Sequence, residues 1–435
     1  MSDDRFMESR IALARALEII PLGTQTFSKA HSAFPGSAAP HFIERARGGR
    51  LWDVDGAEYV DQMCALMPIL LGYCDPDVDN AVKAQLERGM LFSLSSKLEM
   101  ELAELLVRLV PSAEMVRFGK NGTDVTTAAV RLARAATGRD HILMAGYHGW
   151  GDWSIATTSR NWGIPKSVGA LSHAFSYGSI DALASLFRDY PGNIAAVIVE
   201  PAPGNDAFLR EAAEMVRAAG AILIFDEIVS GFRAHLGGVQ ALCGITPDLT
   251  TLGKAMGNGM PISALVGRAD LMRLFEDVFF SGTFSGEALS LAAAIATISK
   301  LESEPVIETL ARNGNRLKVE AERRINEHML GDVISLDGLP QMRKVVFTGT
   351  ADASAAAVKT VFQRGMIRNG VLITQFHGLC YAHNKTDIDV ILTAYDKTLP
   401  VITEEIDKGN LDARLGDTIV RPVFDVRYEK ERTGR

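Results

Sequence analysis

The chain has 435 residues, roughly two to three times the usual size of one domain, so we expect one large domain with a smaller companion. Hydrophobic residues make up 47% of the chain and charged residues 23%, which excludes an intrinsically disordered protein. The balance of 45 basic and 53 acidic residues leaves a net charge of −8, so nucleic acid is not an expected partner.

Residues 1–65 are expected to form an N-terminal arm and a hairpin. A strand-like segment from Leu51 to Val60 is interrupted by Asp53–Gly56, where turn residues gather. This segment is too small to form its own core, so we expect it to pack on the C-terminal part of the chain.

Residues 66–305 alternate short apolar runs with segments of helical periodicity. This alternation is typical of an α/β domain with a mainly parallel sheet covered by helices. Helices are expected over Leu98–Leu109 and from about Thr123 to Ala136. The apolar runs expected to form strands are Met115–Phe118, His141–Ala145, Ala195–Val199, Ala221–Phe225, Leu249–Leu252 and Ala264–Val266.

Residues 306–435 show a different pattern and are expected to form a smaller α+β domain. A long helix is predicted over Val306–Glu327, followed by strand-like pieces at Lys344–Thr348 and Val371–Thr374.

The ends of the predicted strands carry the candidate functional residues, because ligands of open parallel sheets bind outside the carboxyl ends of the strands. The backbone amides of Gly122 and Thr123 begin a predicted helix and could bind a phosphate group. Taken alone, these residues are more often no more than a helix cap. Tyr147 could stack on a flat heteroaromatic ring, although core packing is the commoner fate of an aromatic side chain there.

Two charged residues follow apolar runs at the same expected edge. Asp226 ends a dry strand, where an ionised carboxylate needs a cationic partner such as a protonated pyridine nitrogen; a surface acid or a helix cap is an equally good reading. Lys254 precedes a glycine-rich segment and could form a Schiff base, although a lysine at a strand end is usually solvated. No paired-ligand spacing indicates a metal site.

Cysteine usage and apolar tracts bear on location. Four cysteines without a CxxC pair favour a reducing compartment, so a cytoplasmic location is expected. The acidic start does not read as a signal peptide, and no stretch reaches the ~18 apolar residues of a membrane span, so no membrane association is expected.

Together these residues resemble the class III, or ω-amino-acid type, aminotransferases, which use pyridoxal 5'-phosphate (PLP). Within that family the chain looks most similar to the glutamate-1-semialdehyde 2,1-aminomutases, and the resemblance covers nearly its whole length. The motifs that carry it, in order, are Gly122-Thr123, Tyr147-His148-Gly149, Glu200-Pro201 with Gly204-Asn205, Asp226-Glu227-Ile228, Gly253-Lys254 and Gly282-Thr283-Phe284-Ser285-Gly286.

The resemblance implies the PLP-dependent transferase fold type I, the aspartate-aminotransferase type, as a homodimer with active sites at the interface. Lys254 would form the Schiff base with PLP and Asp226 would pair with the pyridine nitrogen. The resemblance further implies that Gly122 and Thr123 hold the phosphate with Thr283 of the neighbouring subunit, that Tyr147 and Ile228 cover the two ring faces, and that Asn205 reaches the ring hydroxyl.

Two departures from the aminomutase pattern bear on the substrate. Lys29 stands nearest to an arginine of the aminomutase N-terminal arm, and the segment Gln375–Gly378 replaces one that bears a glutamate. Predicted substrate contacts are Lys29, Trp52, Glu200 and His377. At the phosphate loop, Lys120-Asn121-Gly122-Thr123-Asp124 stands where aminomutases read Asn-Ser-Gly-Thr-Glu.

We therefore predict an aminotransferase that moves an amino group between an amino acid or amine and a small polar aldehyde or ketone, by way of pyridoxamine phosphate. An aminomutase-like isomerase, which shifts an amino group within one molecule, is the first alternative. A non-catalytic binding protein on the same fold is the second.

Overall fold

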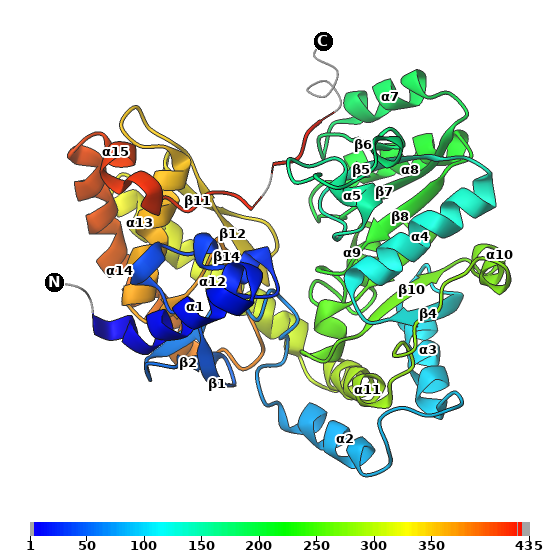
Figure 1. Cartoon of the computed structure of the whole chain (residues 1–435), viewed down its shortest axis with the longest axis horizontal. Helices are drawn as coiled ribbons and strands as arrows, with labels where there is room; N and C mark the ends of the chain where they lie inside the picture. Colours follow the sequence, from blue (N-terminus) through cyan, green and yellow to red (C-terminus); the bar gives the residue numbers. More distant parts are fainter. Residues whose placement is uncertain (1–3, 424, 429–435) are drawn as a thin grey trace. The chain divides into compact units, whose positions relative to one another are not determined.

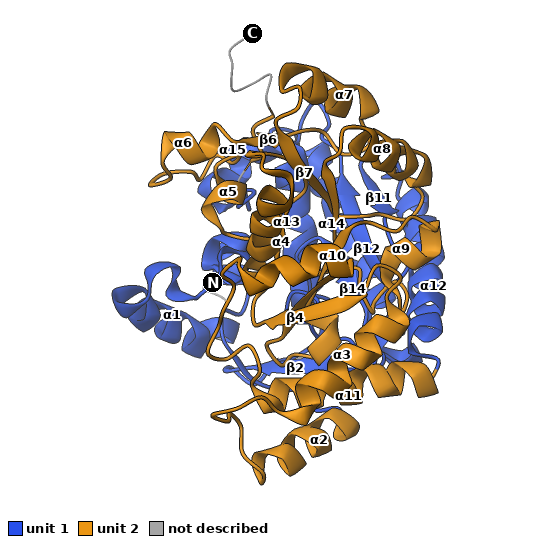
Figure 2. Cartoon of the chain, turned by 90° about the vertical axis from the view of Figure 1, so that its right-hand side faces the viewer, with its two compact units in different colours: residues 1–75, 305–423 blue, residues 76–304, 424–435 orange. Residues whose placement is uncertain are grey.

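The computed structural model describes residues 4–423 and 425–428. The chain divides into two compact units (Figure 2), and each unit is assembled from separate stretches of sequence. The first unit contains residues up to 75 together with 305–423; the second contains 76–304 and the described residues 425–428. The domain boundaries expected from the sequence, at 65 and 305, stay predictions.

The second unit is built on a seven-stranded sheet, counted over its described residues, in the order β4-β10-β9-β8-β7-β5-β6 (Figure 1). Strand β10 is antiparallel to both of its neighbours, whereas the pairs from β9 to β6 are parallel. The strands are β4 Met115–Gly119, β5 His141–Ala145, β6 Ser172–Ala174, β7 Ile194–Val199, β8 Ile222–Asp226, β9 Leu249–Leu252 and β10 Ser263–Gly267.

Burial explains why these strands read as unbroken apolar runs. Every residue of β7, β8, β9 and β10 is buried, because helices cover both faces of a sheet of this kind. The α/β fold class predicted from the sequence is confirmed. The edge strand β6 was not predicted, since its three residues are too few to show a period.

The helices of the second unit connect these strands and supply the rest of its core. Helix α4 contacts β4, β10, β9, β8 and β7. Its side chains Val125, Ala129 and Leu132 belong to the same buried cluster as Ile198 and Ile224 of the sheet. The helices are α2 Pro76–Leu86, α3 Lys97–Leu109, α4 Gly122–Thr137, α5 Asp152–Ile155, α6 Lys166–Gly169, α7 Ile180–Asp189, α8 Asp206–Ala218, α9 Gly238–Cys243, α10 Ala269–Met272 and α11 Ala288–Ser303.

The first unit joins the two ends of the chain. Strand β13 pairs in parallel with β3, Val371 opposite Val60, so the N-terminal hairpin becomes part of a sheet with C-terminal residues. The strands of the first unit are β1 Ile43–Arg47, β2 Arg50–Asp53, β3 Glu58–Asp61, β11 Ile334–Asp337, β12 Met342–Phe347, β13 Val371–Leu372 and β14 Phe376–Gly378. Its α-helices are α1 Met7–Ile19, α12 Val306–Glu327, α13 Ala355–Arg368, α14 Lys385–Asp407 and α15 Leu411–Leu415.

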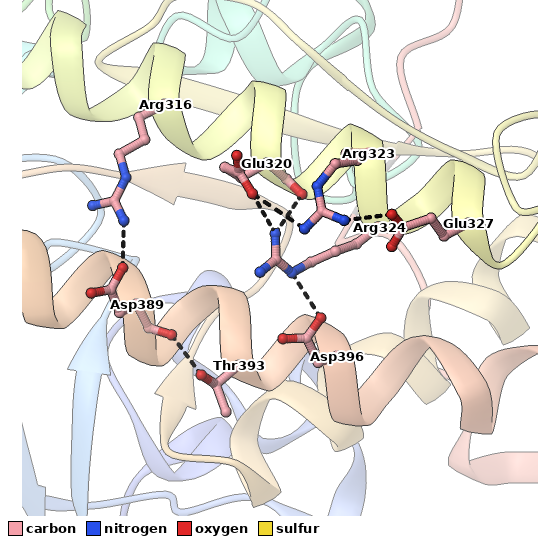
Figure 3. Close-up of polar contacts among 8 residues, drawn as sticks. All are labelled: Arg316, Glu320, Arg323, Arg324, Glu327, Asp389, Thr393 and Asp396. Carbon is pink, nitrogen blue, oxygen red and sulfur yellow. Dashed lines mark hydrogen bonds and ion pairs between the residues drawn. The ribbon is translucent and has the colours of Figure 1, made fainter.

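Helices α12 and α14 are also joined by charged side chains (Figure 3). Arg324 of α12 donates to Asp396 of α14 at 2.7 Å and to Glu320 of its own helix at 2.8 Å. Arg316 pairs with Asp389 across the same two helices. Such exposed pairs add little stability individually, so the apolar stripe of α12, buried beneath them, contributes most to the packing.

A short segment after β3 has an unusual backbone. Cys64, Ala65, Leu66 and Met67 have φ values of 46°, 53°, 71° and 80°, in the left-handed region that favours glycine. Four consecutive non-glycine residues in this conformation store strain in the first unit.

None of the helices in the described part of the chain combines the length and apolar character needed to cross a bilayer.

Candidate active site

The carboxyl edge of the seven-stranded sheet gathers the polar residues of the second unit. Six strands end there: β4 before Lys120, β5 before Gly146, β6 at Ala174, β7 before Glu200, β8 at Asp226 and β9 before Gly253. Because β10 runs in the opposite direction, its first residue, Ser263, lies at this edge beside Gly119. One edge therefore presents loops from all seven strands of this sheet.

Asp226 is a buried carboxylate that is held by three hydrogen bonds. It is 5% exposed. Its Oδ1 accepts from the hydroxyl of Thr251 at 2.9 Å and from the backbone amide of Ile228 at 3.2 Å, and its Oδ2 lies 2.8 Å from Nδ1 of His148. A buried carboxylate with this many donors is fixed in orientation.

His148 is the partner that the sequence analysis did not assign. Its ring is buried and stacks on Trp153 with an interplanar angle of 10°. Nδ1 donates to Oδ2 of Asp226, because a carboxylate accepts hydrogen bonds. Nε2 is buried without a hydrogen-bond partner among the described residues.

Lys254 lies at the start of a 3₁₀ turn, Lys254–Gly257, directly after β9. Its backbone has a φ of 39°, again in the left-handed region. Burial lowers the pKa of its amine below the ordinary value for lysine; the carboxylates of Glu200 and Asp226 act in the opposite direction, and Arg233 acts with burial. A lysine of this kind holds its proton weakly and is suited to covalent and acid–base chemistry.

Glu200 faces the same group of charges. Burial raises the pKa of its carboxyl, and the neighbouring Asp226 raises it further, while His148 and Lys254 oppose this. Its Oε1 accepts from the amide of Tyr147 at 3.0 Å. A Cβ atom at Gly146 would lie 2.9 Å from that oxygen, so the close approach requires a glycine.

The start of α4 forms a compact loop against Ile228. A Cβ atom at Gly122 would lie 2.8 Å from Cδ1 of Ile228, so a larger residue would force the Ile228 side chain to shift. The hydroxyl of Thr123 accepts from the amide of Trp150 at 3.1 Å. The helix start thus lies beside the segment that follows Asp226, with backbone amides and the positive end of the helix dipole at its tip.

Two further predicted cofactor residues lie on loops that precede helices of the second unit. Asn205 precedes α8, and its side-chain oxygen is 4.0 Å from the Cβ position of Gly178, on the loop after edge strand β6. Thr283 is exposed on the loop before α11. Their predicted contacts with the cofactor stay predictions.

The predicted substrate residues are divided between the units. Glu200 belongs to the second unit, whereas Lys29, Trp52 and His377 belong to the first. Lys29 is exposed, and the ring of Trp52 lies 3.7 Å from the guanidinium carbon of Arg45.

His377 is fully buried in the first unit. Its Nδ1 lies 3.0 Å from Oε1 of Gln62 and its Nε2 lies 2.7 Å from the hydroxyl of Tyr395. These bonds support a structural role in the core, and its predicted substrate contact is left untested.

This edge thus combines a helix start suited to a phosphate group, a buried acid and a lysine of lowered pKa. The family model described as aminotransferase class-III matches residues 33–387. The chain belongs to the class III aminotransferase family. It is therefore a PLP-dependent enzyme, as the sequence predicts. The buried, hydrogen-bonded Asp226 and the lowered pKa of Lys254 fit the ring nitrogen and the aldehyde of that cofactor.

Three similar proteins illustrate the activities found in this family. This chain is 34% identical over 416 residues to 3-aminobutyryl-CoA aminotransferase of Cloacimonas acidaminovorans, covering 90% of this chain and 98% of that protein. It is 35% identical over 427 residues to glutamate-1-semialdehyde 2,1-aminomutase of Chloroflexus aurantiacus, covering 90% and 96%. The PLP-containing structure of the FumI protein of Sphingopyxis sp. MTA144 superposes with a TM-score of 0.87 at 31% identity, covering 94% of this chain and all of that one.

Proposed function

We propose that this class III aminotransferase carries out its reaction with Lys254 as the residue that bonds covalently to PLP and Asp226 as the partner of the pyridine nitrogen. The observation that carries this proposal is the geometry of Asp226, a buried carboxylate with three donors whose charge acts to raise the pKa of the Lys254 amine. Gly122 and Thr123 hold the phosphate, and Tyr147 and Ile228 lie on the two faces of the ring. Asn205 is proposed to reach the ring hydroxyl.

Asp226 and Lys254 have separate proposed roles in the reaction. When bound, PLP supplies an electron sink for the pair of electrons released when the Cα–H bond of the amine substrate breaks. Asp226 accepts a hydrogen bond from the ring nitrogen, and His148 and Thr251 hold Asp226 in the orientation that this requires. Once displaced from the cofactor by the substrate amine, Nζ of Lys254 would take the proton from Cα as a general base and would deliver it to C4' of the cofactor as a general acid, which its weak basicity permits.

The substrates are proposed to be an amino acid or amine donor and a small polar aldehyde or ketone acceptor. Lys29, Trp52, Glu200 and His377 are the candidate substrate contacts, with the burial of His377 counting against it. A 3-aminobutyryl-CoA aminotransferase among the relatives supports including β-amino compounds in a donor screen.

We further propose a homodimer with shared active sites, in which Thr283 reaches the phosphate of the partner. Its exposure on the loop before α11 leaves it accessible to a second chain. A cytoplasmic location is proposed because the chain has only four cysteines and no CxxC pair, which suits a reducing compartment.

An aminomutase is the second candidate, because 35% identity to glutamate-1-semialdehyde 2,1-aminomutase of Chloroflexus aurantiacus extends over most of both chains. A single amino-aldehyde substrate without a separate acceptor separates the two. Repeated turnover, with the cofactor returned to its starting form, would favour the aminomutase. One turnover that stops at pyridoxamine phosphate would favour the aminotransferase.

Lys254→Ala tests the central assignment. The variant should lose turnover and the near-visible absorbance of the covalently bound cofactor, while Lys120→Arg, which keeps a cation elsewhere at the same edge, should retain both. Transamination by Lys254→Ala at the rate of the unaltered enzyme would refute the assignment.

A further inference from the structure

An ion pair joins two loops on which the proposed phosphate site depends. Nζ of Lys120 donates to Oε2 of Glu287 at 2.9 Å, and each side chain is 16% exposed. Lys120 directly precedes the loop that leads to Gly122 and Thr123, and Glu287 ends the loop that carries Thr283. Lys120 is also one of the departures from the aminomutase motif, which has asparagine at this position.

The backbone around Lys120 is fixed on its own account. The amides of Lys120 and Asn121 both donate to Oδ2 of Asp124, at 3.0 Å and 2.8 Å. The carbonyl of Asn121 accepts from the hydroxyl of Ser263 at 2.9 Å. The backbone of Lys120 is therefore held in a fixed position relative to the start of α4, and its side chain extends from that position.

Glu287 is equally well anchored, at the start of α11. Its Oε1 accepts from the amide of Leu289 at 2.6 Å and its Oε2 from the amide of Ser290 at 3.2 Å, which makes it the N-terminal cap of that helix. Burial alone would raise the pKa of this carboxyl, but the hydrogen bonds from Ser290 and Lys120 lower it. Glu287 is consequently charged at neutral pH.

The loop between Thr283 and Glu287 has little freedom of its own. The amide of Ser285 donates to the carbonyl of Gly282 at 3.1 Å, and the amide of Glu287 donates to the carbonyl of Phe284 at 3.1 Å. A Cβ atom at Gly286 would lie 2.9 Å from the carboxyl carbon of Glu99. These turns therefore fix the position of Thr283 relative to Glu287.

We propose that Lys120 and Glu287 are positioning residues of the cofactor site. Their ion pair ties the loop of Thr283 to the phosphate loop of its own subunit, and so holds Thr283 where it reaches the phosphate of the partner. The inference rests on the proposed function, from which it takes the homodimer and the role of Thr283. It adds a direct link between a subunit's own phosphate loop and the residue that it contributes to the other site.

The dissociation constant of PLP, titrated into the apoprotein by absorbance, tests this link. Lys120→Ala and Glu287→Gln should each raise it about tenfold, which corresponds to about 1.4 kcal/mol. Glutamine keeps an acceptor for the cap of α11, so the second variant removes the charge with little harm to the helix. Lys120→Arg preserves the ion pair and should restore affinity to within about threefold of the unaltered protein.

A double variant provides the readout that a general loss of stability would not produce. If Lys120 acts through Thr283, the effects of Lys120→Ala and Thr283→Ala on PLP affinity should be far from additive. Lys318→Ala, which removes a lysine paired with Glu322 at 3.6 Å on α12, is the matched control and should leave affinity unchanged. The melting temperature of each apoprotein verifies folding.

The outcomes separate this proposal from the assignment of the site. Additive effects of Lys120→Ala and Thr283→Ala, or unchanged affinity in both Lys120→Ala and Glu287→Gln, would overturn the positioning role and leave Lys254 and Asp226 untouched. Failure of the unaltered protein to bind PLP would instead remove the proposed function itself.

Discussion

Nδ1 of His148 lies 2.8 Å from Oδ2 of Asp226, although the two residues are 78 positions apart in the chain. Both are buried, so little water competes for this hydrogen bond. Because Thr251 and the amide of Ile228 occupy the other carboxylate oxygen, the orientation of Asp226 depends on residues from three strand ends. The precision of the proposed nitrogen contact is therefore a property of the sheet edge as a whole.

Replacement of His148 should weaken cofactor binding more than it weakens the fold. We expect His148→Ala to raise the dissociation constant of PLP about tenfold to hundredfold, since loss of one partner of a buried hydrogen bond costs about 1–3 kcal/mol. Titration of the apoprotein with PLP measures this. His173→Ala, which removes another buried histidine of the same sheet, bonded to His141, is the control and should leave the affinity unchanged. An equal loss in both variants would argue against a specific role for His148.

The pH dependence of cofactor association should report the charge around Lys254. Burial lowers the pKa of this amine, and the carboxylate of Glu200 partly offsets the effect. Glu200→Gln removes that anion, so the pKa of Lys254 should fall further and the neutral, reactive amine should exist at lower pH. The rate of PLP association, measured across pH in the apoprotein, should rise at lower pH in the variant. A shift of the profile toward higher pH would contradict the inferred electrostatics.

Acid should destabilise the fold partly through His377. Burial lowers the pKa of its ring to about 3, below the value of 6.5 that is ordinary for histidine. The unfolded chain therefore binds a proton that the folded chain excludes. The resulting loss of stability begins as the pH falls below about 6.5 and continues toward about 3, at up to about 1.4 kcal/mol per pH unit.

Chemical denaturation of the first unit in the unaltered protein and in His377→Gln measures this effect. The difference between their free energies of unfolding should be constant near pH 8 and should move in favour of the variant between pH 6 and pH 5. A difference that does not depend on pH would show that His377 does not exclude the proton.

The strained turn after β3 offers a stabilising substitution. Ala65 has a φ of 53°, which glycine adopts without the clash of a Cβ atom. Ala65→Gly should raise the free energy of unfolding by up to about 1 kcal/mol, measured by denaturant melts. Ala46→Gly, at an ordinary strand position on β1, should lower it. Destabilisation of the same size in both variants would show that the turn is not strained.

Much of the sheet could be predicted because its strands are buried on both faces and read as apolar runs. The location of Glu200, Asp226 and Lys254 at one edge followed from the ends of those runs. The bonds that His148 and Thr251 make to Asp226 could not be predicted, since side-chain contacts between distant residues leave no local pattern. The left-handed turn that begins at Cys64 also lacked a signal, because its residues are not glycines.

The resemblance to a known family predicted the cofactor, which local sequence patterns did not, but it did not predict every contact near the candidate site. It led to PLP as the cofactor, which the family assignment confirms. It did not predict the ion pair between Lys120 and Glu287, because the chain departs from the aminomutase motif at Lys120.

The pairing of β13 with β3 limits the order in which the two units can fold during synthesis on the ribosome. About three hundred further residues are translated after Val60 before Val371 leaves the ribosome and can pair with β3. Apart from its last few residues, the second unit is one uninterrupted stretch and can collapse during this interval. The nascent N-terminal hairpin spends that time with the edge of β3 that pairs with β13 still exposed.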